Sequence, residues 1–179
     1  MSLKHAIIAL LDLEEGTGYD LVKRFNSSVG HFWSSTHQQV YQELARLTDQ
    51  GWVAFTQVEQ VGKPDKKIYR VTPQGMAELR EWLLKPAKSL KAKDPLLVKI
   101  FAGRHTSREA LLEELARHER EHLDTLEGYE RIEIGLRRSG AMEDKRYLLP
   151  YMTMRLGIRI EKAYLDWVDE VRDALRTHD

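Results

Sequence analysis

The sequence predicts a mainly α-helical protein: an N-terminal winged helix-turn-helix with a two-stranded wing, followed by a C-terminal dimerisation domain of long helices. Two observations predict this fold class. An amphipathic helix that begins near Ser35 is followed at once by two short alternating segments joined by a basic tip at residues 62–67. Beyond Pro95 the pattern changes to long helical stripes. The expected boundaries are 1–85 for the winged domain, 86–95 for a linker and 96–179 for the helical domain.

Two short helices are expected at the N-terminus. Their apolar stripes are Leu3, Ala6, Ile7 and Leu10 in the first, and Tyr19, Val22, Phe25 and Val29 in the second. Thr17, with Asp20 three residues later, is a plausible N-cap pair for the second helix. The backbone amides of Gly18 and Tyr19 would then lie at a helix N-terminus, where a phosphate can dock.

The third helix is expected to begin at Ser35 or Thr36 and to run to Gly51, since each of the first two residues has a Gln three positions on, as in a capping box. Its buried face consists of Val40, Leu44 and Leu47, and its outward face of Gln38, Gln39, Gln42, Glu43 and Arg46. Gln bonds adenine edges and Arg bonds guanine edges, as a helix in a major groove requires. Alone, such a face is more often an ordinary solvated helix surface.

The segments that follow strengthen the DNA-binding interpretation. Residues 52–59 and 67–72 alternate between apolar and polar side chains, as half-buried strands do. The tip between them carries three lysines, whose ammonium groups suit a phosphate backbone. After this wing, Thr72 and Pro73 begin a further helix. Its expected buried side is Met76, Leu79, Trp82 and Leu83.

The expected DNA contacts come from three places. On the third helix, Ser35, Thr36, Gln38, Gln39, Gln42 and Arg46 are expected at base edges and nearby phosphates, with Gln39 as the sharpest assignment. Tyr41 would lie at the base of that helix or on a phosphate, with core packing beside Leu44 as an equal alternative. The remaining contacts are Gly18 and Tyr19 on the second helix and Lys63, Lys66 and Lys67 on the wing.

Several short motifs occur in an order that resembles a known family. They are Leu10-Leu11, Gly18-Tyr19-Asp20-Leu21, the run from His37 to Leu44, Gly62-Lys63-Pro64 and Tyr69-Arg70-Val71-Thr72-Pro73. These motifs resemble the PadR family of transcriptional regulators. The C-terminal half, through Asp94-Pro95-Leu96 and Tyr164-Leu165-Asp166-Trp167, resembles the PadR branch with a virulence-activator type of helical dimerisation domain. The resemblance implies a homodimeric, mostly repressing DNA-binding protein, which in some relatives responds to phenolic or other hydrophobic small molecules.

Composition sets further bounds on the protein. Its 179 residues are 42% hydrophobic and 31% charged, a balance typical of globular domains. The formal net charge is zero, which is unusual for a DNA-binding protein, but Lys4, Lys23, Arg24 and the three wing lysines can form a local basic stripe. The absence of cysteine agrees with a reducing cytoplasm. No run of eighteen apolar residues occurs, so no membrane span is expected.

The C-terminal half is expected to mediate homodimerisation. A short helix from Leu96 to Ala102 should precede a long helix that ends near Arg138 and a last helix that begins near Pro150. Their stripes expose too much apolar surface for a monomer. The expected dimerisation residues are Leu111, Leu115, His118, His122, Leu126, Tyr129, Met152, Leu156, Ile160, Trp167 and Val171. The alternative is a helical hairpin that folds back on the winged domain.

One motif belongs to a different class of protein. His118-Glu119-Arg120-Glu121-His122 matches the H-E-x-x-H pattern of zinc peptidases, which place two imidazoles and a general base on one helix face. No third ligand follows in a recognisable continuation, so this interpretation is disfavoured. A weak metal site across a dimer interface is the second interpretation. The simplest is two histidines at a helix interface, where they would make dimerisation sensitive to pH.

The sequence therefore predicts a regulator rather than an enzyme, because no catalytic constellation is visible. No cofactor or metal ion is expected. The expected partners are double-stranded DNA, a second copy of the chain and a small hydrophobic effector. The effector would lie near Phe101, Tyr129, Tyr151, Met152, Met154 or Trp167, although these residues suit a plain interface core as well. The alternative function is a scaffolding dimer whose winged domain contacts another protein.

Overall fold

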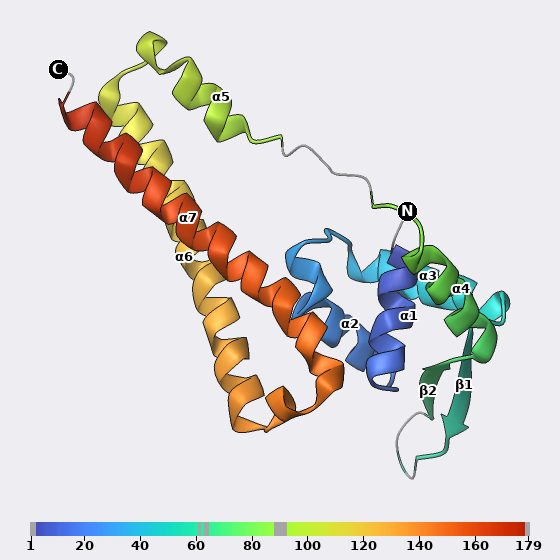
Figure 1. Ribbon diagram of the computed structural model, residues 1–179. Helices are drawn as coiled ribbons and strands as arrows, with labels where there is room; N and C mark the ends of the chain where they lie inside the picture. The colour runs from blue at the N-terminus through green and yellow to red at the C-terminus, as the bar shows by residue number, and fades with distance from the viewer. Residues whose placement is uncertain (1–2, 61, 63–64, 88–92, 178–179) are drawn as a thin grey trace. The chain divides into compact units, whose positions relative to one another are not determined.

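The computed structural model describes residues 3–60, 62, 65–87 and 93–177 (Figure 1). The chain divides into two compact units, residues 1–88 and 89–179, here called the winged unit and the helical unit. Lys63, one of the expected wing contacts, lies outside the described residues. The described part is mainly helical with one two-stranded sheet, which confirms the predicted fold class.

The described residues of the winged unit form four α-helices and the sheet, in the predicted order; Figure 1 labels them. Its elements are α1 (Leu3–Leu13), α2 (Gly18–Asn26), the 3-10 turn η1 (Val29–His31), α3 (His37–Asp49), β1 (Val53–Val58), β2 (Lys66–Val71) and α4 (Pro73–Leu83). The core contains side chains from each of these α-helices and from β1: Ile7, Ile8, Leu11, Leu21, Phe25, Val40, Leu44, Leu47, Val53 and Leu79 are buried. The predicted buried face of α3 is therefore confirmed.

Three expectations for the apolar stripes of this unit were wrong. Tyr19 and Leu83 are exposed, and Val29 lies in η1 because α2 ends at Asn26. Tyr19 and Leu83 both lie in terminal turns of their helices. Periodicity shows which side of a helix is buried, but it does not show how much of the helix length the neighbouring elements cover. For this reason the predictions for the two terminal residues were wrong.

A buried histidine lies under α4. The His5 ring is 3% exposed, stacks on the Trp82 ring with 4.3 Å between centroids, and its Nε2 lies 3.4 Å from Glu78 Oε1. Lys4 donates to the same carboxylate at 2.9 Å. Burial lowers the pKa of His5 below 6.5, although the hydrogen bond to Glu78 acts in the opposite direction. The histidine is therefore held mainly in its neutral form.

This burial predicts a loss of stability in mild acid. The unfolded chain binds a proton at His5 more readily than the folded chain does, so the stabilisation is present above about pH 6.5 and is lost as the pH falls below it. We expect a His5→Phe variant, which can still stack on Trp82, to lose less stability than the wild type between pH 7.5 and pH 5.5. Urea unfolding at both values measures this, and equal losses in the two proteins would contradict it.

Within residues 93–177, the described part of the helical unit, one short α-helix precedes two long ones. Its elements are α5 (Pro95–Phe101), η2 (Gly103–His105), α6 (Arg108–Arg138), η3 (Ala141–Glu143), η4 (Lys145–Tyr147) and α7 (Leu148–Thr177). Figure 1 shows α6 and α7 packed side by side in opposite directions. Leu96, Leu115 and Val168 form a small core where α5 joins this pair. None of the described helices is long and apolar enough to span a membrane.

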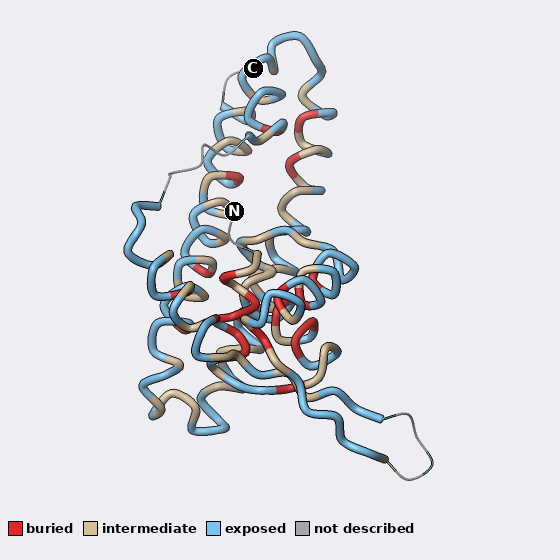
Figure 2. Tube along the Cα trace, turned by 90° about the vertical axis from the view of Figure 1, so that its right-hand side faces the viewer, coloured by how far each residue is buried: buried red, intermediate tan, exposed pale blue. Residues whose placement is uncertain are grey.

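The middle of the α6–α7 pair depends on a close approach at Gly157. A Cβ atom on Gly157 would lie 2.4 Å from the Tyr129 hydroxyl oxygen, so the tyrosine ring occupies the space that a side chain would need. Tyr129, Tyr151 and Ile158 are buried in this region. Elsewhere buried positions are sparser along α6 and α7 than in the winged unit (Figure 2). Much of the apolar surface of α7 is therefore uncovered in one chain.

Candidate nucleic-acid interface

A reciprocal pair of hydrogen bonds sets the start of α3. The Thr36 hydroxyl oxygen accepts from the Gln39 amide at 3.2 Å, and the Gln39 side-chain oxygen accepts from the Thr36 amide at 2.8 Å. The capping box therefore forms on Thr36 rather than on Ser35. The Ser35 hydroxyl supports it by donating to the same Gln39 oxygen at 3.2 Å.

This cap conflicts with the role expected for Gln39. A bidentate contact with adenine needs both the oxygen and the nitrogen of the glutamine amide, and the cap already engages the oxygen. Gln38 and Gln42, which are also exposed on α3, have the same chemistry. In the free protein the cap therefore competes with a bidentate contact of Gln39 to adenine, and the base contacts of all three glutamines stay predictions.

The one arginine of α3 is paired within its own helix. The Arg46 guanidinium donates to Glu43 Oε1 at 2.7 Å, and this bond raises the pKa of Arg46. The Glu43 side chain is half-buried, whereas that of Arg46 is largely exposed. Arg46 lies on the outward face, as expected, but the carboxylate of Glu43 counters its charge. From the sequence, Glu43 is expected to be another surface residue of that face.

The N-terminus of α2 is closed by its own acidic residue. Thr17 and Asp20 form a full capping box, as predicted, and the hydrogen bonds from Thr17 lower the pKa of Asp20. The box uses the amides of Thr17 and Asp20, not those of Gly18 and Tyr19. Because a carboxylate stands at this helix end, the site is less favourable for a phosphate than the sequence suggested.

Gly18 has a packing role in the winged unit. A Cβ atom there would lie 2.7 Å from Cε1 of Tyr41 and 3.7 Å from a methyl group of Leu44. The Tyr41 ring therefore packs on the backbone of α2 beside Leu44, while the side chain stays 46% exposed. The packing alternative for Tyr41 is therefore met in part, and the exposed part of the ring leaves the contact with a phosphate as a prediction.

The two described wing lysines point to opposite faces of the sheet. The strands pair antiparallel with Phe55 opposite Tyr69 and Gln57 opposite Lys67. Because side chains alternate along a strand, Lys67 shares the face of Tyr69, and Lys66 shares the face of Arg70. The Lys67 ammonium lies 4.3 Å from the centroid of the Phe55 ring.

Arg70 is a basic wing residue that the sequence interpretation missed. It is exposed and donates to the Thr56 hydroxyl of β1 at 2.7 Å. The only signal for Arg70 in the sequence is that it alternates with Ile68 and Lys66 along the same strand, so that the three side chains share one face. This signal becomes meaningful once the strand register is known.

Part of the expected basic stripe has a structural role. Lys4 bonds Glu78 and lies 4.5 Å from the centroid of the Trp52 ring. Arg24 donates to the backbone oxygens of Glu14 and Glu15, the second at 3.1 Å. These two cations hold the winged unit together, so the cations of the wing carry more of the expected attraction for phosphate.

The same two-part organisation is found in known regulators. Residues 7–81 match the transcriptional regulator PadR-like family, and residues 92–176 match the virulence activator alpha C-terminal family. A probable transcriptional regulator of Mycobacterium tuberculosis is 33% identical over 98% of both chains. The chain belongs to the PadR-like family. It is a transcriptional regulator of the PadR type, and its fold is that of the DNA-binding winged-helix regulators.

Solved structures of PadR-like proteins cover the whole fold. Bacillus subtilis PadR in complex with operator DNA has a TM-score of 0.84 and 28% identity, with 98% of this chain and 99% of that chain covered. The Vibrio cholerae virulence activator AphA has a TM-score of 0.77 and 31% identity, with 99% and 100% covered. Bacillus subtilis PadR, described as a negative transcriptional regulator, is 29% identical over 94% of both chains. It was also solved with p-coumaric acid, at a TM-score of 0.76 and 26% identity over 97% of this chain and 95% of that one.

In this PadR-like protein the histidine motif lies at the contact between α6 and α7. His122 is hydrogen-bonded through Nδ1 to Glu161, and its ring stacks on Tyr164 with 3.7 Å between centroids. His118 lies 3.6 Å from Glu114 of its own helix. Among the residues that the structure describes, no group of three or more His, Cys, Asp or Glu side chains is placed to hold a metal ion.

The residues expected to mediate dimerisation of this PadR-like protein differ in how exposed they are within one chain. Leu111, Leu115 and Tyr129 are buried within one chain, and His122, Trp167 and Val171 pack between its own helices. His118 and Leu126 are intermediate. Met152, Leu156 and Ile160 are exposed on α7, and they continue into an apolar groove formed by Leu97, Ile160, Ala163, Tyr164 and Trp167. The exposed residues are the most accessible to a second copy, and the role of the whole set in dimerisation stays a prediction.

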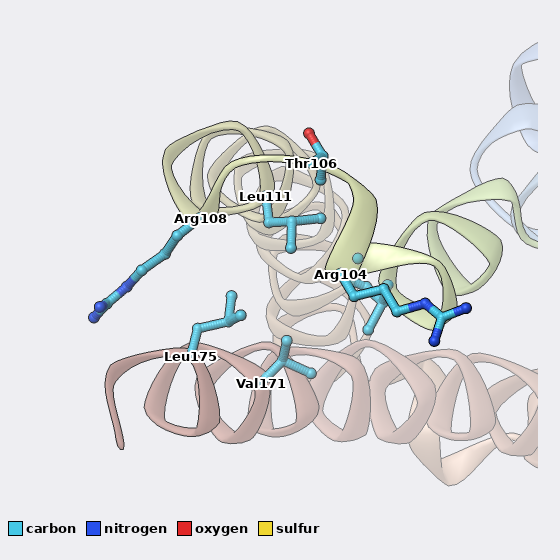
Figure 3. Close-up of a pocket in the computed structure, with 8 residues that line it drawn as sticks. Arg104, Thr106, Arg108, Leu111, Val171 and Leu175 are labelled. Carbon is cyan, nitrogen blue, oxygen red and sulfur yellow. The ribbon is translucent and has the colours of Figure 1, made fainter. Parts of the chain in front are cut away.

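The aromatic residues expected around an effector are not gathered in one place. Phe101 is 94% exposed, Tyr129 packs on Gly157, and Tyr151 donates to Glu133. A separate cavity of about 270 Å³ lies where α5, α6 and α7 meet, lined by Ile100, Gly103, Arg104, Thr106, Arg108, Leu111, Val171 and Leu175. Figure 3 shows Leu111, Val171 and Leu175 converging on it, while the guanidinium groups of Arg104 and Arg108 extend away. Its walls are therefore mainly apolar.

Proposed function

We propose that this PadR-like regulator binds a two-fold symmetric operator as a homodimer and represses transcription. The observation that carries the proposal is the exposed polar face of α3, followed directly in the chain by a wing whose described residues include Lys66, Lys67 and Arg70. The complex of Bacillus subtilis PadR with operator DNA supports DNA binding, and that protein's description as a negative regulator supports repression.

Within this proposal, α3 and the wing have different tasks. Base edges in the major groove are read by Gln38, Gln42 and Arg46. Tyr41 contacts the phosphate backbone of the DNA at the base of the helix. Lys66 and Lys67, on opposite faces of the wing, suit the two phosphate backbones that border a minor groove about 6 Å wide. Arg70 adds a cation on the Lys66 face.

Dimerisation is supported by the uncovered surface of α7. Leu149, Met152, Leu156 and Ile160 are exposed at three- and four-residue intervals, so they line one side of the helix. An apolar stripe of this length is costly to leave in water and is typical of a subunit interface. A two-fold axis through this contact would present two copies of α3 to two half-sites.

Wing lysine variants test the phosphate contacts. We expect Lys66→Ala and Lys67→Ala each to weaken binding to all duplexes alike, because a phosphate contact carries no base information. Each should lower the slope of log affinity against log salt by about 0.9 per protomer, with additive effects in the double variant. Fluorescence anisotropy across a salt series measures this, using a duplex selected by the wild type from a random-sequence pool and a scrambled duplex.

Lys162→Ala, which removes an exposed lysine from α7, is the matched control and should leave the slope unchanged. An unaltered slope in the double wing variant would show that the wing does not contact DNA. Weak and equal binding of the wild type to both duplexes would contradict the proposed function as a whole. It would favour a protein-docking role for the winged unit, since fold does not determine function.

We further propose that a small hydrophobic acid regulates DNA binding from the cavity between α5, α6 and α7. Its apolar walls and its volume of about 270 Å³ support this, as does the p-coumaric acid complex of Bacillus subtilis PadR. We expect saturating p-coumaric acid to weaken DNA binding about fivefold or more. Val171→Phe, which narrows the cavity, should abolish the response. Unchanged wild-type affinity would exclude this acid, and a response that survives the substitution would place the site elsewhere.

A further inference from the structure

The charges of α3 are unusual for a helix that is to approach DNA. The helix carries one arginine, Arg46, and two carboxylates, Glu43 and Asp49, so its charged side chains sum to −1 with His37 neutral. Attraction for phosphate must therefore come from elsewhere, chiefly from the wing. What α3 adds is the geometry of its polar groups rather than its net charge.

Glu43 and Arg46 form a defined pair on this helix. The two residues are three positions apart, the guanidinium nitrogen lies 2.7 Å from Glu43 Oε1, and the side chains are 17% and 55% exposed respectively. The carboxylate is thus the more fixed partner, and the guanidinium is the group that can turn outward. Pairs as exposed as this one contribute little to stability, so a stronger partner can displace the carboxylate.

Two kinds of DNA group compete differently for such an arginine. A guanine edge offers two acceptors, O6 and N7, which match the fork of the guanidinium. A phosphate on an unselected sequence offers a contact that any free cation can make. To bind Arg46, this phosphate must displace Glu43 from the guanidinium, and the Glu43 carboxylate repels it. Holding the arginine therefore weakens binding to the wrong sequences more than to the right one.

We propose that Glu43 is a specificity-determining residue of the DNA site: its carboxylate holds Arg46 so that the guanidinium contributes where it meets a guanine edge, and not where it meets an unselected backbone. This inference rests on the proposed function. Glu43 acts through Arg46 and is a positioning residue, not itself a contact to DNA. Specificity here comes from penalising the wrong partner rather than from an additional attraction.

The test compares the selected and scrambled duplexes in wild type, Glu43→Gln, Arg46→Gln and the double variant. We expect Glu43→Gln to raise affinity for the scrambled duplex about fivefold, and to steepen its salt slope by about 0.9 per protomer, because a released guanidinium gains a phosphate contact. Affinity for the selected duplex should change less. The selectivity ratio, which is the affinity for the selected duplex divided by the affinity for the scrambled duplex, should therefore fall. With Arg46 replaced by Gln, the further change at Glu43 should leave the ratio unchanged.

Glu81→Gln is the matched control. It removes one carboxylate from an exposed pair at the C-terminal end of α4, in which Glu81 lies 2.7 Å from Lys85 just beyond the helix, and so changes the charge of the winged unit equally. The selectivity ratio should stay at the wild-type value. Thermal unfolding followed by circular dichroism checks the fold of each variant, and Glu43→Asp, which shortens the side chain but keeps its charge, should shift the ratio in the same direction by less.

Two results would overturn the inference while leaving the proposed function intact. One is an unchanged ratio in Glu43→Gln. The other is a lower ratio that arises only from weaker binding to the selected duplex and persists when Arg46 is replaced, because Glu43 would then contact a base directly. A wild type that does not distinguish the two duplexes would remove the proposed function, and this inference with it.

Discussion

A Gly75→Ala variant is expected to lose most of the stability of the winged unit. Gly75 lies in the first turn of α4, and a Cβ atom there would lie 2.2 Å from the Trp52 carbonyl oxygen and 3.0 Å from its carbon. That oxygen cannot easily move, because it accepts from the Thr72 amide at 3.0 Å and from the Thr72 hydroxyl at 3.1 Å. We expect the free energy of unfolding to fall by about 3 kcal/mol or more, since the clash is with backbone.

Urea unfolding followed by tryptophan fluorescence measures this effect, because Trp33, Trp52 and Trp82 all lie in the winged unit. Gly135→Ala is the matched control. Gly135 lies inside α6, and apart from its chain neighbours and the nearby backbone of its own helix no described atom lies within 4 Å of the added Cβ, so the same substitution should there stabilise the helix by up to about 1 kcal/mol. Equal unfolding midpoints for wild type and Gly75→Ala would show that the junction between β1 and α4 can relax.

Replacing Leu156 and Ile160 together by Glu is expected to produce monomers that no longer bind DNA tightly. The two side chains are 60% and 54% exposed in one chain, so acidic residues there should cost the chain's own fold little. In a symmetric interface each substitution occurs twice, and four carboxylates would have to be buried in apolar contact. With one half-site per monomer, DNA affinity should fall by at least about a hundredfold, a loss of about 3 kcal/mol.

Light scattering gives the mass in solution, and anisotropy with the selected duplex gives the affinity. Lys162→Glu is the control, because it changes the charge of α7 by −2, as the double variant does, at an exposed position away from the stripe. It should remain dimeric and bind DNA. A double variant that keeps the wild-type mass would contradict the assignment of this stripe to the dimer.

The starts of the helices could be predicted because their signals are local. The boxes Thr36–Gln39 and Thr17–Asp20, and the Pro73 start of α4, each depend on residues within a single turn. The buried face of α3 was equally accessible, since Val40, Leu44 and Leu47 repeat at helical spacing. Local signals of this kind were sufficient for the fold class and for locating the candidate interface.

The roles of individual side chains in that interface were harder to predict, because one residue can serve two purposes. Gln39 is suited both to adenine and to a helix cap, and the hydrogen bond to the Thr36 amide shows which of these it serves in the free protein. Gly18 is suited both to a phosphate site and to a close approach; the contact with the Tyr41 ring shows the close approach, and the phosphate site stays a prediction. Composition and spacing do not distinguish such alternatives.

The helical unit shows the same division on a larger scale. The apolar periodicity of the sequence predicted two long helices, and it predicted that one chain leaves part of their apolar surface uncovered. Which side of α7 faces α6 depended on contacts between residues far apart in the chain, above all the fit of Tyr129 against Gly157. That contact buries Tyr151 and Ile158 and turns Met152, Leu156 and Ile160 outward. Periodicity shows that a helix has apolar sides. Which of these sides faces the neighbouring helix is decided by packing, because packing depends on the shapes of the side chains at each point of contact.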